Sequence, residues 1–385
     1  MDSPVLESRK QQSITGTIMT DLEFVVPDFS TVRYPVNVVA DMLNVSVPSI
    51  KKYEKDMGLE VERQSTGVQS RRYSLENIFD IAAHRRTSGL IKPLNRPITL
   101  TVHVKKGGVA KTTLAVNLAI QLSLAGYKTL LVDNDPQGDA TSMLSFDPDL
   151  SVAELEEMGH PASRAVELHF GHLFKFGGAF SGHDLKDVIK KPFGENGLHL
   201  IPADESLDDL NVALTNANNS DFRFGLLIEQ SRKGKLKNCD LSGYDFIIFD
   251  CPPSSTVAAR NALVACDYIV TPVRMDRLSV KGLSRLTQSL SVFEEDYNRA
   301  PTPIVVPTMF QKNRPRTQRN LAMLMQHFNT RVTDVRLHHS EDYPKAMDEG
   351  YPVSIWKGAS PAIRNEFRDL ATEIIQRIIA DVGER

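Results

Sequence analysis

The stretch Lys105-Lys106-Gly107-Gly108-Val109-Ala110-Lys111-Thr112-Thr113 decides the fold of this chain. It follows an apolar run at residues 100–104, which predicts a buried strand, and it precedes an apolar, helix-forming segment at residues 114–125. Glycines between a strand and a helix let backbone N–H groups close around phosphate oxygens, and the unpaired amides at the helix start add partial positive charge. The stretch therefore predicts a phosphate-binding loop.

Two side chains of this loop predict that its ligand is a magnesium nucleotide. Lys111 is placed to reach the β- and γ-phosphates. The hydroxyl of Thr112, directly after that lysine, is the type of ligand that a phosphate-bound Mg²⁺ takes from a protein. We expect ATP or ADP to be bound by Lys106, Gly107, Gly108, Val109, Ala110, Lys111, Thr112 and Thr113.

The loop departs from the common pattern G-x-x-x-x-G-K-[ST], because Lys105 and Ala110 occupy its two glycine positions. It has instead an extra lysine, Lys106, just before the paired glycines. In this feature the chain resembles the deviant Walker A ATPases of the ParA/MinD family. The resemblance implies that Lys106 contacts phosphate across a nucleotide-sandwich dimer. Ala110 replaces the commoner glycine, a departure that bears on loop geometry and on the turnover rate.

A second motif, Asp133-Asn134-Asp135-Pro136-Gln137-Gly138, ends the apolar run at residues 128–132. Ligands of α/β sheets gather at such carboxyl ends of strands. The motif is similar to the D-x-D-P-Q element of the same family. The resemblance implies that Asp135 orients the attacking water and that Asp133 supports the magnesium region. The catalytic residues are then expected to be Lys106, Lys111 and Asp135.

A third apolar run, at residues 244–249, delivers Asp250 at its tip. This acid fits a Walker B carboxylate, which holds Mg²⁺ through its water shell opposite Thr112. The expected metal-site residues are Thr112, Asp133 and Asp250. In relatives the segment after a late strand holds the adenine, so the resemblance indicates Thr308 and Met309 for this role.

Apolar runs continue at residues 267–273 and 304–310, with a helical segment at residues 278–293 between them. Alternating strands and helices of this length predict an α/β fold with a doubly wound, mostly parallel sheet. The family resemblance covers residues 98–385, which we interpret as the ATPase domain. Residues 93–97 contain two prolines and are interpreted as a linker.

Residues 31–92 carry a separate pattern. Two helices at residues 35–43 and 48–57, joined by a short turn, suit a helix-turn-helix, and residues 59–73 with Gly67 at a turn suit a β-wing. The segment is similar to the winged helix-turn-helix of MerR-like regulators and to the N-terminal extension of larger plasmid-type ParA proteins. Residues 1–30 are expected to form a dimerisation arm, and a disordered tail is the alternative.

Charge predicts that DNA contact is regional. Residues 31–92 hold ten Lys/Arg and seven Asp/Glu, whereas the whole chain has a net charge of −3. We expect this domain to bind DNA through Ser49, Lys51, Lys52, Lys55, Arg71 and Arg72. Relatives use basic residues of the C-terminal third for sequence-independent DNA, which indicates Arg316, Arg319, Arg336 and Arg364. A solvated surface is the alternative for each of these side chains.

The composition fits a globular chain of two or three domains, with 385 residues of which 41% are hydrophobic. No apolar run approaches the roughly 20 residues of a membrane span, so we expect no membrane association and a cytoplasmic, nucleoid-associated location. Three cysteines without C-x-x-C spacing argue against a disulfide framework and a zinc site. We interpret His160, His169 and His172 as packing or surface residues.

The resemblance implies a partition ATPase that converts ATP and water to ADP and phosphate. ATP would form the homodimer and drive non-specific DNA binding, a ParB-like centromere-binding partner would stimulate slow hydrolysis, and the winged helix would repress the partition operon. The alternative is a repressor that senses nucleotide with negligible turnover. A MinD-like membrane ATPase is disfavoured because residues 367–382 lack a strongly basic face, and an iron–sulfur reductase because the cysteines do not lie at cluster positions.

Overall fold

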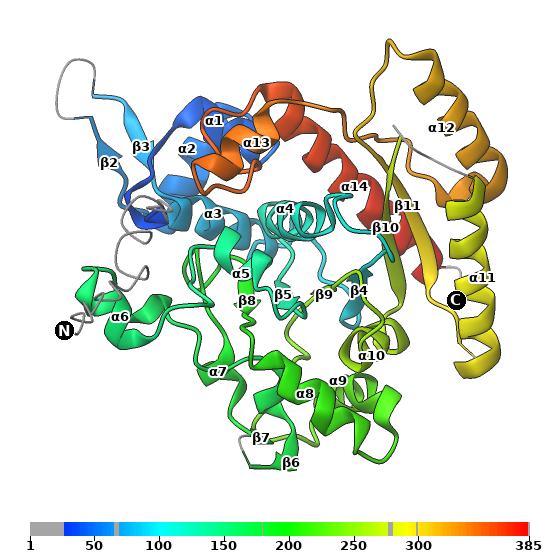
Figure 1. Cartoon of the computed structure of the whole chain (residues 1–385). Helices are drawn as coiled ribbons and strands as arrows, with labels where there is room; N and C mark the ends of the chain where they lie inside the picture. Colours follow the sequence, from blue (N-terminus) through cyan, green and yellow to red (C-terminus); the bar gives the residue numbers. More distant parts are fainter. Residues whose placement is uncertain (1–26, 65–68, 179, 276–279, 298, 384–385) are drawn as a thin grey trace, which may run out of the picture.

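A computed structural model describes residues 27–64, 69–178, 180–275, 280–297 and 299–383 of the chain (Figure 1). Most of the expected N-terminal arm lies outside the described residues, as does Gly67 at the predicted turn of the wing.

A six-stranded sheet forms the centre of the molecule. Its strand order is β11-β10-β4-β9-β5-β8, and every neighbouring pair is parallel. This confirms the predicted α/β class with a mostly parallel sheet. The strands are β4 (Ile98–Val102), β5 (Thr129–Asp133), β8 (His199–Ile201), β9 (Phe246–Asp250), β10 (Tyr268–Arg274) and β11 (Thr302–Thr308).

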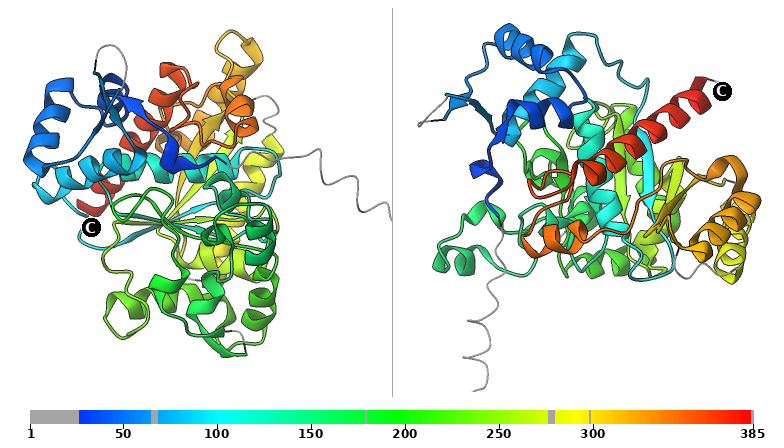
Figure 2. Two further views of the ribbon diagram at one scale, coloured as in Figure 1. Left: turned by 90° about the vertical axis from the view of Figure 1, so that its left-hand side faces the viewer. Right: turned by 90° about the horizontal axis from the view of Figure 1, so that it is seen from above.

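Two hydrophobic cores cover the two faces of this sheet, because successive side chains of a strand point to opposite faces. In β9, Phe246 and Ile248 belong to the core under α4 (Lys111–Leu124) and α14 (Pro361–Gly383). Ile247 and Phe249 belong to the core on the other face. That second core is covered by α8 (Leu207–Thr215), α9 (Arg223–Arg232) and α10 (Val257–Ala265), as the two layers of helices in Figure 2 show.

Further elements complete the ATPase region. The helices α11 (Val280–Tyr297) and α12 (Pro315–Phe328) lie beside β10 and β11 at the edge of the sheet (Figure 1). The shorter elements are α5 (Asp139–Met143), α6 (Val152–Glu157), η3 (Ala162–Arg164), η4 (Phe170–Leu173), β6 (Lys175–Gly177), β7 (Phe180–Ser181), α7 (Leu185–Val188), η5 (Ser220–Phe222), η6 (Asn329–Arg331) and α13 (Asp342–Asp348).

The N-terminal region contains the elements predicted for it, in the predicted order. Helices α1 (Val36–Met42) and α2 (Val47–Met57) are followed by the strands of the wing, and α3 (Leu75–Thr87) then leads toward β4. The Ser46 side chain accepts a hydrogen bond at the start of α2, and Gly58 ends that helix at a φ of 62°. The short helix η2 (Phe29–Thr31) precedes a three-stranded sheet of β1 (Tyr34–Pro35), β2 (Glu62–Arg63) and β3 (Arg71–Tyr73), whose spatial order is β1-β3-β2.

Sequence reasoning treated residues 93–97 as a linker between separate units, but residues 29–87 share one continuous hydrophobic core with the ATPase region. Helix α3 packs on α4. Phe79 of α3 stacks on Phe193, with ring centroids 4.9 Å apart and planes at 10°. The Tyr34 hydroxyl donates a hydrogen bond to the Ile355 carbonyl. The N-terminal elements are therefore held rigidly against the sheet layer that carries α4.

This shared core predicts how the chain unfolds. We expect Phe79→Leu to lower the free energy of unfolding by about 0.5–1.5 kcal/mol, the size of a stacked aromatic pair, and we expect one cooperative transition to move as a whole. Denaturant unfolding followed by circular dichroism measures this. Met158→Leu, a change at a 58% exposed side chain, is the control and should leave the midpoint in place. Two separate transitions, of which only one moves, would contradict the shared core.

Candidate active site

The predicted phosphate loop connects β4 to α4 at the carboxyl edge of the sheet. Gly108 and Ala110 both adopt left-handed backbone conformations, with φ values of 65° and 66°. A residue with a Cβ pays roughly 1–2 kcal/mol for this conformation, which explains why glycine is the commoner residue at the position of Ala110. The loop nevertheless leads from the end of β4 into the first residue of α4, so the N-terminus of that helix is at the predicted phosphate site.

Lys111 is the first residue of α4 and is only 9% exposed. Its Nζ donates a hydrogen bond of 3.3 Å to the carbonyl of Lys106, so the amine lies over the loop. The side chain of Lys106 itself is exposed. The two lysines therefore differ in setting, because Lys111 is enclosed and Lys106 is exposed to solvent.

Arg274 is a part of this site that sequence reasoning missed. It ends strand β10, next to β4 in the sheet, and its Nη1 donates a hydrogen bond of 3.0 Å to the carbonyl of Gly108. The guanidinium thus holds the glycine turn from the side. A basic residue at the carboxyl end of a predicted parallel strand was the available signal, because all such ends meet at one edge of the sheet.

Two of the predicted carboxylates meet directly beside the loop. Strand β9 lies between β4 and β5, and Asp250 is the register partner of both Val102 and Asp133. Asp250 and Asp133 therefore end neighbouring strands at the same edge of the sheet. Three segments that are far apart in the sequence are brought together here, as predicted from the motifs.

Asp133 uses both carboxylate oxygens within the protein. Its Oδ2 accepts hydrogen bonds from the Thr141 backbone N–H at 2.9 Å and from the Thr141 hydroxyl at 2.8 Å, and its Oδ1 accepts one from the Asp135 N–H at 3.2 Å. Burial raises the pKa of Asp133 to about 7, and these hydrogen bonds only partly oppose the rise. Asp133 is thus placed to fix the loop at residues 134–141 and to support the metal region indirectly.

Asp250 is 1% exposed, and neither of its carboxylate oxygens has a hydrogen bond of ordinary geometry within the described structure. Burial raises its pKa well above the usual value, the nearby Asp133 raises it further, and the Thr112 side chain opposes the rise in part. An unpaired buried carboxyl is costly unless a cation or a donor completes it. Asp250 therefore fits a group that binds the water shell of Mg²⁺, with Thr112 on the facing helix.

Asp135 lies in the loop after β5 and is half-buried. Its Oδ1 accepts a hydrogen bond of 3.1 Å from the Gln137 N–H, which leaves its second oxygen for other partners. Burial raises the pKa of Asp135, and the hydrogen bond from Gln137 partly opposes this. The carboxylate is therefore placed in a partly wet position, as a group that orients water must be.

Thr308 and Met309, the residues predicted to hold the adenine, lie at the end of β11 on the same edge of the sheet. Thr308 is the register partner of Arg274, and its buried hydroxyl oxygen has no hydrogen-bond partner in the described structure. Met309 has a positive φ of 51° at the point where the chain leaves the strand. Their role in base binding stays a prediction.

The basic residues predicted to bind DNA in the N-terminal region fall into two groups. Lys51, Lys52 and Lys55 are exposed on α2. Arg71 instead forms an ion pair of 2.8 Å with Glu54, which joins β3 to α2. Ser49 lies half-buried near the start of α2, with its hydroxyl 2.9 Å from that of Ser46, and Arg72 donates to the Gln64 side chain.

The four basic residues predicted in the C-terminal third also lie in different settings. Arg316 and Arg319 are exposed on α12. The guanidinium of Arg336 lies 5.1 Å from the ring centroid of Phe310. Arg364 is 13% exposed and lies 3.8 Å from the Asp41 carboxylate, at the contact between α14 and α1. Its position assigns it to packing of the N-terminal region, which its sequence context did not reveal.

The histidines and cysteines that sequence reasoning excluded from metal sites are buried, except for His160, which is half-buried. His169 and His172 are buried, and the Nδ1 of His169 accepts a hydrogen bond from the Gly171 N–H at 3.0 Å. All three cysteines, Cys239, Cys251 and Cys266, are buried free thiols. Among the described residues no helix combines the length and the apolar character that crossing a membrane requires.

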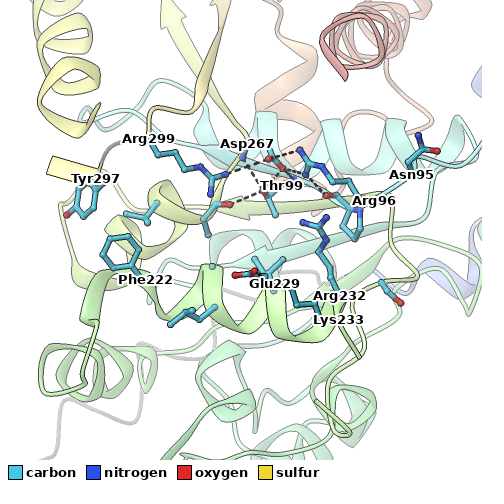
Figure 3. Close-up of a pocket in the computed structure, with 17 residues that line it drawn as sticks. Asn95, Arg96, Thr99, Phe222, Glu229, Arg232, Lys233, Asp267, Tyr297 and Arg299 are labelled. Carbon is cyan, nitrogen blue, oxygen red and sulfur yellow. Dashed lines mark hydrogen bonds and ion pairs between the residues drawn. The ribbon is translucent and has the colours of Figure 1, made fainter. Parts of the chain in front are cut away.

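A cavity of about 580 Å³ lies at the opposite edge of the sheet, and its lining includes no residue of the phosphate loop (Figure 3). At its rim Asp267 accepts two hydrogen bonds from Arg96, at 2.9 and 3.0 Å, and one from the Thr99 N–H at 2.9 Å. Burial would raise the pKa of Asp267, but these bonds outweigh it and hold the pKa below its usual value. This network fixes the linker to the amino ends of β4 and β10.

Comparison with known proteins adds to this geometry. A family model described as an AAA domain matches residues 98–301, more than half of the chain. The chromosome-partitioning ATPase Soj of Thermus thermophilus is 30% identical over 281 residues, which cover 71% of this chain and 94% of Soj. The chain belongs to the ParA-type family of partition ATPases.

Solved structures agree with the fold of this ParA-type chain. A structure described as a partition protein is 19% identical, has a TM-score of 0.52 and covers 92% of this chain and 94% of its own. Cobyrinic acid a,c-diamide synthase of Mycobacterium smegmatis, with bound ADP and magnesium, is 19% identical with a TM-score of 0.53 and covers 74% of this chain and 96% of its own. At these identities the likeness concerns the fold alone.

Proposed function

We propose that this ParA-type ATPase is a DNA-partition protein whose nucleotide state controls its binding to DNA. The observation that carries the proposal is the meeting of the phosphate loop, the enclosed amine of Lys111 and the unpaired buried carboxyl of Asp250 at one edge of the sheet. Asp135 adds a half-buried carboxylate on the loop beside them. Together these groups supply phosphate binding, a metal site and a means to orient water.

The metal site would be formed by Thr112 directly and by Asp250 through water. Bound Mg²⁺ neutralises charge that develops on the β- and γ-phosphate oxygens. Neither oxygen of Asp250 has a hydrogen bond of ordinary geometry, whereas both oxygens of Asp133 do, so the contact with the water shell of the metal is assigned to Asp250. Burial raises the pKa of Asp135, which makes its carboxylate a better acceptor for a proton of the attacking water.

ATP binding is proposed to join two copies of the chain face to face across the nucleotides. The exposed side chain of Lys106, next to the loop that encloses Lys111, is placed to reach a phosphate outside its own loop. The dimer would bind DNA without sequence preference, hydrolyse ATP slowly and release the DNA when a ParB-like partner stimulates turnover. This role for two copies follows from the family to which the chain belongs.

Two DNA surfaces are proposed, with different duties. The exposed lysines of α2 would bind an operator in the manner of a winged helix and repress the partition operon. The exposed Arg316 and Arg319 of α12 would contact random-sequence DNA in the ATP state. The two sets lie on distant elements, so they can be removed one at a time (Figure 1).

Paired variants test this division. The slope of log K against log salt is negative, and each lost phosphate contact makes it less steep by about 0.9. Arg316→Ala with Arg319→Ala should therefore reduce the steepness for random duplex DNA in ATP by about 1.8. The same variant should leave operator binding in ADP unchanged. Lys51→Ala with Lys52→Ala should have the reverse pattern, and each double variant is the control for the other. Fluorescence anisotropy with duplexes selected by the protein from a random pool measures both, and equal effects of both variants on both DNAs would contradict the division.

A further inference from the structure

Three basic side chains from three separate segments lie near one another beside the wing, defined here as β2 and β3. Arg33 precedes β1, Arg72 lies in β3, and Lys357 lies in the ATPase domain between α13 and α14. In the sheet register Pro35 of β1 is opposite Arg72. The Nζ of Lys357 lies 5.6 Å from the ring centroid of Tyr34, the other residue of β1.

The chain that carries Lys357 is fixed against the N-terminal elements. The Tyr34 hydroxyl donates to the Ile355 carbonyl two residues earlier. The indole N–H of Trp356 donates a hydrogen bond of 2.7 Å to Glu349. Because both residues before Lys357 are held, the exposed lysine side chain extends from a rigid base.

The charge of this cluster is only partly neutralised. Arg33 forms an ion pair of 2.6 Å with Glu62. Arg72 donates to the neutral side chain of Gln64 at 3.0 Å, and Lys357 takes part in no ion pair with a described residue. Burial lowers the pKa of Lys357, and the positive charges of Arg72 and Arg33 lower it further, which is how three close cations act on one another.

Two of the three cations, Arg33 and Arg72, lie on the face of the wing that points away from α2. Successive residues of a strand point to opposite faces, and Arg71 points toward α2, where it pairs with Glu54. Arg72 therefore faces the other way, as does Glu62, its register partner, which pairs with Arg33. Lys357 lies beside the edge strand β1, over the ring of Tyr34. Helix α2 thus lies on one side of the wing, and Arg33 and Arg72 lie on the other.

We propose that Arg33, Arg72 and Lys357 form a phosphate-contacting cluster, so that the DNA-binding face of the winged helix continues onto the ATPase domain. The proposal rests on the operator binding proposed above. The minor groove of duplex DNA is about 6 Å wide and is bordered by the phosphates of both strands. A two-stranded wing at such a groove has phosphates on both sides, and Arg33, Arg72 and Lys357 supply cations in addition to the lysines of α2.

One consequence is that bound operator DNA touches the ATPase domain directly. Lys357 lies between α13 and α14, and α14 packs on α4, the helix that begins at Lys111 of the phosphate loop. DNA held by Lys357 would therefore be one packed helix away from α4. The winged helix and the ATPase domain would then contact the operator together, in addition to being joined by the linker.

Salt dependence of binding tests the cluster. The probe is a 30-base-pair duplex, of about three helical turns, that the protein selects from a random pool in the presence of ADP. Lys357→Gln should make the negative slope of log K against log salt less steep by about 0.9, and Arg72→Gln should do the same. Lys357→Arg keeps the charge and should keep the slope. Lys237→Gln, a change at an exposed lysine after α9, is the matched control and should also keep it.

The outcomes separate this inference from the function on which it rests. If Lys357→Gln and Arg72→Gln leave the slope unchanged while Lys52→Gln makes it less steep, operator binding stands and the cluster is wrong. If no sequence is selected from the pool, operator binding fails and the cluster fails with it. A thermal unfolding curve for each variant shows whether a lost contact reflects unfolding, and the Lys357→Arg variant then decides the role of the charge.

Discussion

Lys111→Ala is expected to lower steady-state ATP turnover by a factor of about 10²–10³, the usual cost of removing one preorganised group that stabilises transition-state charge. The amine of Lys111 is buried and held over the loop by the Lys106 carbonyl, so its removal takes an enclosed positive charge from the loop. Phosphate release in the presence of DNA and Mg²⁺ measures the effect. Lys237→Ala removes the same charge from an exposed position far from the loop and should change turnover less than twofold.

Asp135→Ala should lower turnover by a similar factor of about 10²–10⁴, as expected for a group that activates water, but for a different reason. It removes a carboxylate that orients water and leaves the phosphate loop intact, so ATP affinity should stay within a few-fold of wild type. Equilibrium binding of a fluorescent ATP analogue separates the two variants. If wild-type turnover with DNA and partner present equals that of Lys111→Ala, the chain is a nucleotide-sensing repressor and the ATPase proposal is wrong.

Asp250→Asn is expected to have two opposite effects. The nucleotide-free variant should be more stable than wild type by about 1–3 kcal/mol at alkaline pH, because a buried carboxyl without partners is costly. The same variant should lose most of the stabilisation that Mg-ATP gives, which is about 2.7 kcal/mol at a hundredfold excess over Kd. Thermal unfolding with and without Mg-ATP measures both effects, and Asp149→Asn at an exposed site should produce neither.

The pH dependence of this difference has a definite sign. The pKa of Asp250 is raised in the folded protein and is near 3.8 in the unfolded chain. The carboxyl therefore costs nothing extra below about pH 4, and its cost grows as pH rises from 3.8 through the raised pKa. Wild type and Asp250→Asn should converge in stability at acidic pH and diverge at alkaline pH. A constant difference across this range would contradict the assignment of a raised pKa to Asp250.

The parts of the site that could be predicted from sequence are the parts encoded by local patterns. The glycines and Lys111 lie within nine residues, and Asp133 and Asp250 each end an apolar run, so their place at a strand tip follows from the pattern. The parallel order of β4, β9 and β5 then brings the two acids together. Predicting that the motifs meet needed only the rule that parallel strands share a carboxyl edge.

The parts that could not be predicted depend on contacts between distant segments. Arg274 reaches the Gly108 carbonyl only because β10 is next to β4. Arg364 looked like a free basic residue in the sequence, but the docking of α1 on α14 places it beside Asp41. Asp133 looked like a metal-region acid, but the turn at Thr141 occupies its oxygens. In each case tertiary packing, and not the neighbouring sequence, determines which group the side chain contacts.

The same reason explains the underestimated role of the N-terminal region. Its helices and wing have clear local signals, but the stack of Phe79 on Phe193 joins residues 114 positions apart, as their numbers show. A prolyl segment at residues 93–97 indicates a break in helical structure and says nothing about packing on either side of it. The shared core is therefore a property that only the assembled structure reveals.

Binding of the purified protein to random-sequence duplex DNA with ATP, with ADP and without nucleotide, at one fixed salt concentration, tests the central claim most directly. We predict tight binding in ATP alone, abolished by Lys111→Ala and prolonged by Asp135→Ala, because the first removes nucleotide binding and the second removes hydrolysis. Binding that is the same in all three nucleotide states and in both variants would contradict a nucleotide-controlled partition cycle.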